Sequence, residues 1–142
     1  IERALTYMKR NTAIPGGYVA YSGGLGGGTD SMNRSAVATL VYSVGQKKEW
    51  EEYKAVTGHI TAGLKHKETG HRHYFLYYMA QALFQADYGS WLEWNRDTSR
   101  KLATEQAPDG SFTGSYGEAY GTAMSLLALA LNYRFLPIYE RF

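Results

Sequence analysis

The segment "RHYFLYYMAQALFQ", residues 72–85, decides the fold because it lacks a polar face wide enough for solvent. Placed on a helix of 3.6 residues per turn, its aromatic and aliphatic side chains point in nearly every direction. Such a helix is stable in water only when other elements cover it on several sides. The segment therefore predicts a buried helix inside an all-α protein that has more than one layer of helices.

Polar and apolar helical segments alternate along the rest of the chain. The apolar segments begin near residues 31, 72 and 119, a spacing of about 40 to 48 residues that is typical of helical hairpin repeats. This order predicts three hairpins in two layers, with apolar helices inside and amphipathic helices outside. We expect the apolar helices over residues 31–44, 72–85 and 120–131. We expect the amphipathic helices over residues 2–10, 47–65 and 90–106, the last one capped by Ser90.

The loops that precede the apolar helices, here called leading loops, share a pattern. "PGGY" at residues 15–18 and "PDGSF" at residues 108–112 both place Pro, Gly and an aromatic residue ahead of an apolar helix. Such loops favour tight turns. The pattern indicates a degenerate internal repeat.

Composition limits the classes of function. The 142 residues suit one compact unit, and 44% hydrophobic residues can form a core. The net charge is +2 and the basic residues are scattered, so we expect no nucleic-acid partner. No apolar run is long enough to predict a membrane span. Cys is absent, which excludes disulfides and thiolate metal sites but leaves the compartment unknown. The chain starts at Ile1, so a processed precursor and a piece of a longer chain both remain open.

Three segments resemble a known superfamily. "QAPDGSF", residues 106–112, is similar to the QW motif (Gln, three residues, Gly, one residue, Trp) of the squalene-hopene cyclase and prenyltransferase superfamily, with Phe112 in the Trp place. "GGLGGGTDSMNRSAVATLVYSVG", residues 23–45, resembles its Gly-rich approach to an inner helix. "YGTAMSLLALALNYRFLPIYER", residues 120–141, resembles the closing repeat of bacterial prenyltransferase and squalene-oxidase repeat proteins. In this resemblance Gln106, Asp109, Gly110 and Phe112 form the structural motif.

The resemblance implies an α/α toroid, in which inner and outer helices alternate around a central cavity. Full toroids of this superfamily contain about six hairpins, so three hairpins imply half a toroid. Residues 1–142 would form a single toroid-like domain, either the C-terminal half of a larger toroid or a subunit completed by a protein partner or a second copy. The family's catalytic signatures do not carry over. There is no DxDD acid, no Cys to hold the zinc of protein prenyltransferases and no GCGEQ thioester sequence.

Titratable residues gather where the apolar helices begin. If these starts lie at one end of the fold, they form a cavity mouth. The candidates for this mouth are Asp30, Arg34, His71, His73, Tyr74, Glu118 and Tyr120. We expect no bound cofactor. The alternative is a zinc or iron site made by His71, His73, Asp30 and Glu118.

Each of these groups also has a simpler interpretation. Acids are stabilised at helix N-termini by the helix dipole, and the two His residues can be polar rim. Glu118 or Asp30 can serve as a general acid if burial raises its pKa, whereas pairing with Arg34 would lower it. The glycines of residues 106–122 can cradle an anion, but a tight turn closed by Asp109, with Phe112 packed inward, is favoured.

The chain has 13 Tyr, 5 Phe and 3 Trp residues. Tyr74, Tyr77 and Tyr78 crowd one helix, which suits an isoprenoid or sugar ligand as well as a wide core. Three functions follow. The favoured one is a non-catalytic toroid module for binding or assembly, which does no chemistry on its own. The alternatives are a terpene cyclase or prenyltransferase with its catalytic residues in a missing half, and a carbohydrate-active toroid.

Overall fold

The computed structural model describes residues 1–22, 25 and 31–134. Within these residues the secondary structure is helical, apart from one isolated antiparallel bridge between Thr12 and Val19. The all-α fold class is therefore confirmed. The helices are α1 (Glu2–Arg10), α2 (Met32–Val44), α3 (Glu51–Ala62), α4 (Arg72–Ala86), α5 (Tyr88–Glu105) and α6 (Glu118–Ala130).

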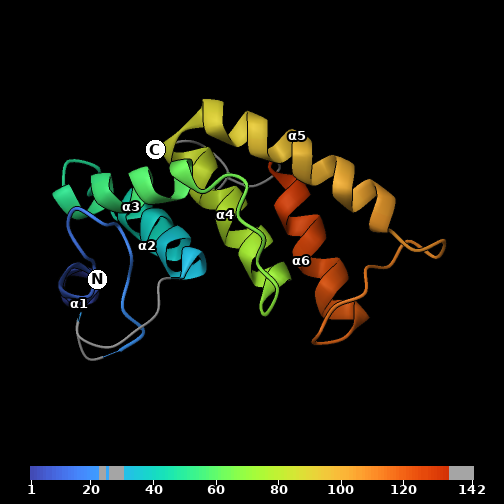
Figure 1. The fold of residues 1–142 in the computed structure, drawn as a ribbon, viewed down its shortest axis with the longest axis horizontal. Coiled ribbons are helices and arrows are strands. Elements are labelled where there is room, and N and C mark those ends of the chain that lie inside the picture. The colour runs from blue at the N-terminus through green and yellow to red at the C-terminus, as the bar shows by residue number, and fades with distance from the viewer. Residues whose placement is uncertain (23–24, 26–30, 135–142) are drawn as a thin grey trace.

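The helices form two layers, as their alternating polarity predicts. Helices α2, α4 and α6 lie side by side in a row, with α4 in the middle (Figure 1). Helix α3 packs on α2 and α4, and α5 packs on α4 and α6, while α1 packs against α2. We call α2, α4 and α6 the inner row. This arrangement agrees with hairpin repeats, and closure of the row into a toroid stays a prediction.

Helix α4 is the centre of the core, as its all-round apolar sequence predicts. Met79, Leu83 and Phe84 are fully buried. The Phe84 ring meets the ring of Trp91 on α5 edge-on, with 5.1 Å between the ring centroids. Edge-to-face aromatic pairs add to the stabilisation that burial provides. The outer helix α5 is thereby fixed on α4.

Two of the leading loops contain a turn with a positive-φ glycine. Gly17 and Gly110 both have positive φ, 71° and 89°, and both donate their backbone N–H to the carbonyl of an alanine, at 2.9 Å. Two residues further on, Val19 and Phe112 are both 4% exposed. The two loops thus share a positive-φ glycine two residues before a buried side chain, but the buried side chain of the first loop is not its aromatic residue. Tyr18 is 39% exposed, because Val19 takes the buried place.

Two helix boundaries differ from the prediction. Helix α5 begins at Tyr88, and its cap is Asp87, whose carboxylate accepts a hydrogen bond of 2.7 Å from the backbone N–H of Ser90. The sequence "DYGS" therefore starts a helix as well as ending one, because Gly89 is tolerated in a first turn. Helix α3 is shorter than residues 47–65, because turn and bend residues 48–50 precede it and Gly63 caps its C-terminal end.

The inner row runs parallel, so its three helices all begin at the same edge of the molecule (Figure 1). We call this the leading edge, since the leading loops reach it. Parallel helices also bring the positive ends of their dipoles to one side. No helix within the described ranges is long and apolar enough to cross a bilayer.

Candidate functional site

The leading edge brings aromatic and imidazole rings from α4 and from the loop before α6 together. His71, at the N-cap of α4, stacks on Tyr116 with 6.0 Å between ring centroids. Its Nδ1 lies 3.0 Å from the Tyr116 hydroxyl, within hydrogen-bond distance. His73 meets Tyr120 edge-on at 6.4 Å. The edge thus joins the starts of two neighbouring inner helices, and the cavity mouth over all three stays a prediction.

Three more tyrosines extend this cluster. Together the five form what we call the tyrosine row: Tyr74, Tyr77, Tyr78, Tyr116 and Tyr120. Ring centroids are 4.5 Å apart between Tyr74 and Tyr78, 4.9 Å between Tyr77 and Tyr78, and 5.5 Å between Tyr116 and Tyr120. Burial raises the pKa of Tyr74, and the nearby hydroxyls of Tyr78 and Tyr120 raise it further. Burial also raises the pKa of Tyr120, as do Tyr116 and Tyr78. Tyr74 and Tyr120 therefore keep their hydroxyl protons at neutral pH and can donate hydrogen bonds.

His73 is enclosed by glycine. The side chain is 6% exposed, and within the described part of the chain its Nε2 has no hydrogen-bond partner. A Cβ atom at Gly114 would lie 3.1 Å from His73 Nδ1, and one at Gly121 would lie 2.6 Å from the carbonyl oxygen of Phe112. These glycines of the segment 106–122 let the loop and α6 approach an imidazole closely.

Burial gives His73 a testable titration. Desolvation lowers its pKa below the ordinary value of 6.5; Arg72 lowers it further, and Glu105 partly opposes this. In the unfolded protein His73 binds a proton near pH 6.5, whereas in the folded protein it stays neutral to lower pH. The contribution of neutral His73 to stability is therefore complete above pH 6.5, and it declines as the pH falls toward the folded-state pKa. We expect the free energy of unfolding of the wild type to fall relative to that of His73→Leu between pH 7 and pH 5, measured by urea denaturation. Parallel pH profiles would contradict this.

A cavity of about 280 Å³ lies beside His71, between the start of α2 and the loop before α4. Asn33, on the first turn of α2, is only 7% exposed, and its Oδ1 is buried without a hydrogen-bond partner among the described residues. The carboxylate of Glu68 accepts a hydrogen bond of 3.1 Å from the Gly70 N–H. The lining residues are Ser31, Met32, Asn33, Arg34, His66, Glu68 and His71.

Glu68 is ionised at neutral pH. Burial tends to raise its pKa, but hydrogen bonds from the Gly70 N–H, His66 and the His71 N–H outweigh this, so the pKa lies below its ordinary value. A charged carboxylate can only accept hydrogen bonds. Glu68 and Asn33 therefore give this cavity two acceptors of different kinds.

The other predicted site residues occupy different environments. The Arg34 Nε donates a hydrogen bond of 2.6 Å to the Val19 carbonyl, which ties the first leading loop to α2. Glu118 is the first residue of α6 and is exposed. Asp30 lies outside the described residues. In the described ranges, no three His, Asp or Glu side chains come close enough to hold a metal ion, so the four-residue zinc or iron set is not assembled there.

The QW-like residues form a compact turn. The Asp109 carboxylate accepts hydrogen bonds from the backbone N–H and the hydroxyl of Ser111, at 3.0 and 2.8 Å. The Gln106 side-chain amide donates to the Gly110 carbonyl at 3.0 Å. Phe112 is buried, and its N–H donates to the hydroxyl of Thr122 on α6 at 2.9 Å. Each of the four residues serves the geometry of the turn.

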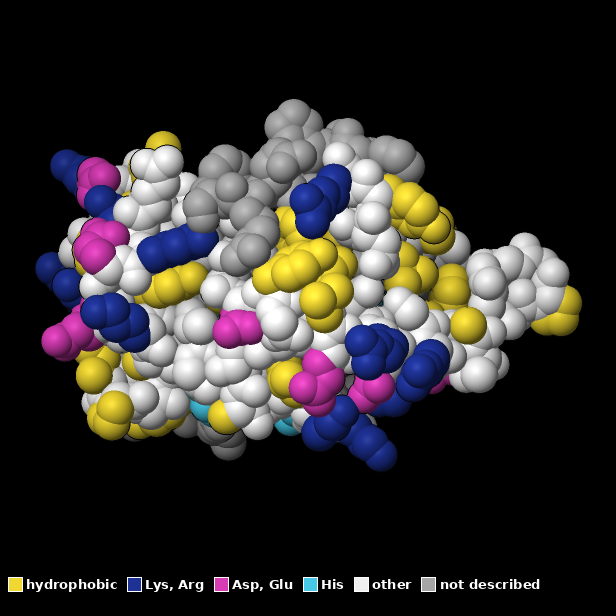
Figure 2. All heavy atoms as spheres, turned by 90° about the horizontal axis from the view of Figure 1, so that it is seen from above, with side chains coloured by type: hydrophobic (Ala, Val, Ile, Leu, Met, Phe, Trp, Pro, Cys, Tyr) yellow, Lys and Arg dark blue, Asp and Glu magenta, His cyan; other side chains and the backbone are white. Residues whose placement is uncertain are grey.

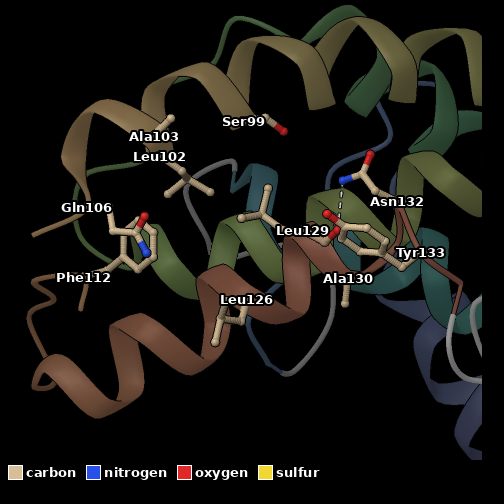
Figure 3. A pocket seen from close by; sticks show the side chains of 10 residues that line it. All are labelled: Ser99, Leu102, Ala103, Gln106, Phe112, Leu126, Leu129, Ala130, Asn132 and Tyr133. Carbon is tan, nitrogen blue, oxygen red and sulfur yellow. Dashed lines mark hydrogen bonds between the residues drawn. The ribbon is translucent and has the colours of Figure 1, made fainter. Parts of the chain in front are cut away.

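A second hollow lies between α5 and α6. This groove has a volume of about 620 Å³. Leu102 and Leu129 face it from the two helices, Gln106 and Phe112 lie at one end, and Asn132 lies at the other (Figure 3). Asn95 and Asn132 hold the far end of the two helices together through a hydrogen bond of 2.8 Å. Seen from above, hydrophobic side chains gather over the middle of the molecule, and basic and acidic side chains alternate along its margin (Figure 2).

Sequence reasoning missed the acceptors of the cavity. Asn33 and Glu68 carry no motif, and only the polarity of Asn33 within an apolar helix could have marked it. No family model, no curated protein and no solved structure matches this chain. The likeness to the squalene-hopene cyclase and prenyltransferase superfamily therefore stays a prediction.

Proposed function

We propose that the chain is a non-catalytic assembly module, which binds a second copy of itself through the outer flank of α6. The observation that carries this proposal is the exposure of that flank. Leu126 and Leu127 on α6 are 55% and 39% exposed, and Leu126 lines the apolar groove against α5. Exposed apolar surface of this kind marks interaction sites.

The regularity of the inner row supports the proposal. Helix α4 covers one flank of α2, and α6 covers one flank of α4. No described helix covers the next flank of α6 in the same way. Repeat proteins need a polar outer face where a stack of repeats ends, and α6 does not provide one. The surface suits another apolar inner helix as its occupant.

A second copy supplies such a helix. Two α6 flanks can pack against each other about a two-fold axis, so that the same leucines meet their equivalents. This arrangement would extend the inner row into the partner.

We expect Leu126→Glu to abolish self-association, because the dimer would bury an unpaired carboxylate. The wild type should be dimeric at concentrations on the order of 100 μM, and the dissociation constant of the variant should rise about a hundredfold or more. Leu92→Glu is the matched control, since Leu92 on α5 is 43% exposed but does not line the groove. Analytical ultracentrifugation measures both. A monomeric wild type, or equal effects of the two variants, would overturn the proposal.

A further inference from the structure

We propose that the leading edge binds a neutral oligosaccharide, with the tyrosine row as its platform and the Asn33 cavity as its polar pocket. This site is separate from the α6 flank, so it goes beyond the assembly function proposed above. His71 connects its two parts, because it stacks on Tyr116 and also lines the cavity.

The tyrosine row has the chemistry that sugars require. A sugar ring presents C–H groups on its faces and hydroxyls around its edge. Tyr116 and Tyr74 are 60% and 37% exposed, so part of each side chain is open to a ligand, although His71 stacks on the Tyr116 ring. The adjacent rings of Tyr78 and Tyr120 lie 4.5 and 5.5 Å from them. A row of rings with hydroxyl groups offers stacking and hydrogen bonds to successive units of a chain.

A ligand that enters the cavity must supply a hydrogen-bond donor. Asn33 Oδ1 is a buried acceptor without a partner in the described structure, which is unfavourable unless a ligand supplies the donor. Glu68 is a second acceptor in the same cavity. A volume of about 280 Å³ is slightly below the usual range of ligand pockets, which suits a single sugar ring better than a large molecule.

These acceptors distinguish sugars from other ligands of aromatic surfaces. A polyproline segment stacks on tyrosines but has no backbone N–H groups, so it cannot satisfy Asn33. An isoprenoid chain has no donor at all. A sugar hydroxyl donates to Asn33 or Glu68 and also accepts from a tyrosine hydroxyl. The combination of stacked rings with buried acceptors therefore favours a saccharide.

The test is titration with maltohexaose, cellohexaose and chitohexaose, followed by saturation-transfer NMR and calorimetry. We expect at least one of them to bind, with saturation transferred to its ring protons. Tyr116→Ala should weaken the affinity about tenfold, through loss of a stacking partner. Tyr7→Ala is the matched control, because Tyr7 on α1 is 58% exposed and stands outside the tyrosine row. It should bind as the wild type does.

Asn33→Ala separates a binding role from a structural one. Removal of an unpaired buried oxygen should leave the protein as stable as the wild type or more so, while sugar affinity falls about tenfold. The proposal is overturned if none of the three sugars binds at millimolar concentration, if decaproline binds in their place, or if Tyr7→Ala weakens binding as much as Tyr116→Ala does. Binding that persists in Leu126→Glu would show that the site is independent of self-association.

Discussion

Gly17→Ala is expected to destabilise the fold by about 3–5 kcal/mol, enough to unfold much of a marginally stable domain. The residue has a φ of 71°, a conformation that costs a residue with a Cβ atom about 1–2 kcal/mol. The new Cβ would also lie 2.1 Å from the carbonyl oxygen of Ala55 on α3. That oxygen belongs to a helix backbone and cannot move aside, so the leading loop would have to separate from α3. Urea denaturation followed by circular dichroism measures the loss.

Gly58→Ala is the control for this prediction. Gly58 lies within α3, and a Cβ there would meet nothing within 4 Å. Because alanine favours helix over glycine, this variant should gain about 0.5–1 kcal/mol. Opposite signs for the same chemical change would establish that the turn, and not loss of glycine as such, controls stability. A Gly17→Ala protein as stable as the wild type would contradict the turn geometry described for residues 11–20.

Phe112→Ala should cost about 3–5 kcal/mol, as is typical when a buried phenylalanine leaves a cavity. Phe112 is 4% exposed and belongs to the main core with Leu102 and Leu131. Its loss should also widen the groove between α5 and α6, which Phe112 lines. The free energy of unfolding from urea denaturation gives the value.

Tyr18→Ala is the matched test of the repeat. If Tyr18 were the equivalent of Phe112, as the sequence pattern suggests, its loss would be similarly costly. The structure places Val19 in that position, so Tyr18→Ala should change stability by about 0.5 kcal/mol or less. A large effect at Tyr18 would restore the register that the sequence alone indicates.

The two-layer fold was predictable because hydrophobic periodicity reports how many faces of a helix are buried. The apolar segment around Leu83 had to be covered on all sides, and it is. Helix ends were less predictable, since they depend on local capping hydrogen bonds and backbone angles, which hydrophobic periodicity does not reveal. The sequence suggests that a whole turn, "DYGS", separates α4 from α5. In the structure a single extended residue, Asp87, separates them, because it ends α4 and caps α5.

The candidate site was predictable only in its location. The sequence places His71 and His73 at the beginning of one inner helix, close to where the other inner helices begin. It does not show that His71 is exposed and His73 is enclosed. That difference arises from Gly114, in the loop before α6, and Gly121, in α6, which lie more than 40 residues away in the chain and make room for His73. Long-range complementarity of this kind leaves no periodic signal. The Asn33 cavity was missed for the same reason.

The leading loops and the links at the opposite edge differ in how easily their length can change during evolution. The links at the opposite edge are short, and a single residue, Asp87, joins α4 to α5. Insertions there would shift whole helices. The loop of residues 63–71 instead has no buried residue and approaches the leading edge, so its length can vary at little cost to the core. Descendants of this fold can therefore acquire new ligand specificity at that edge, while the opposite edge preserves the architecture.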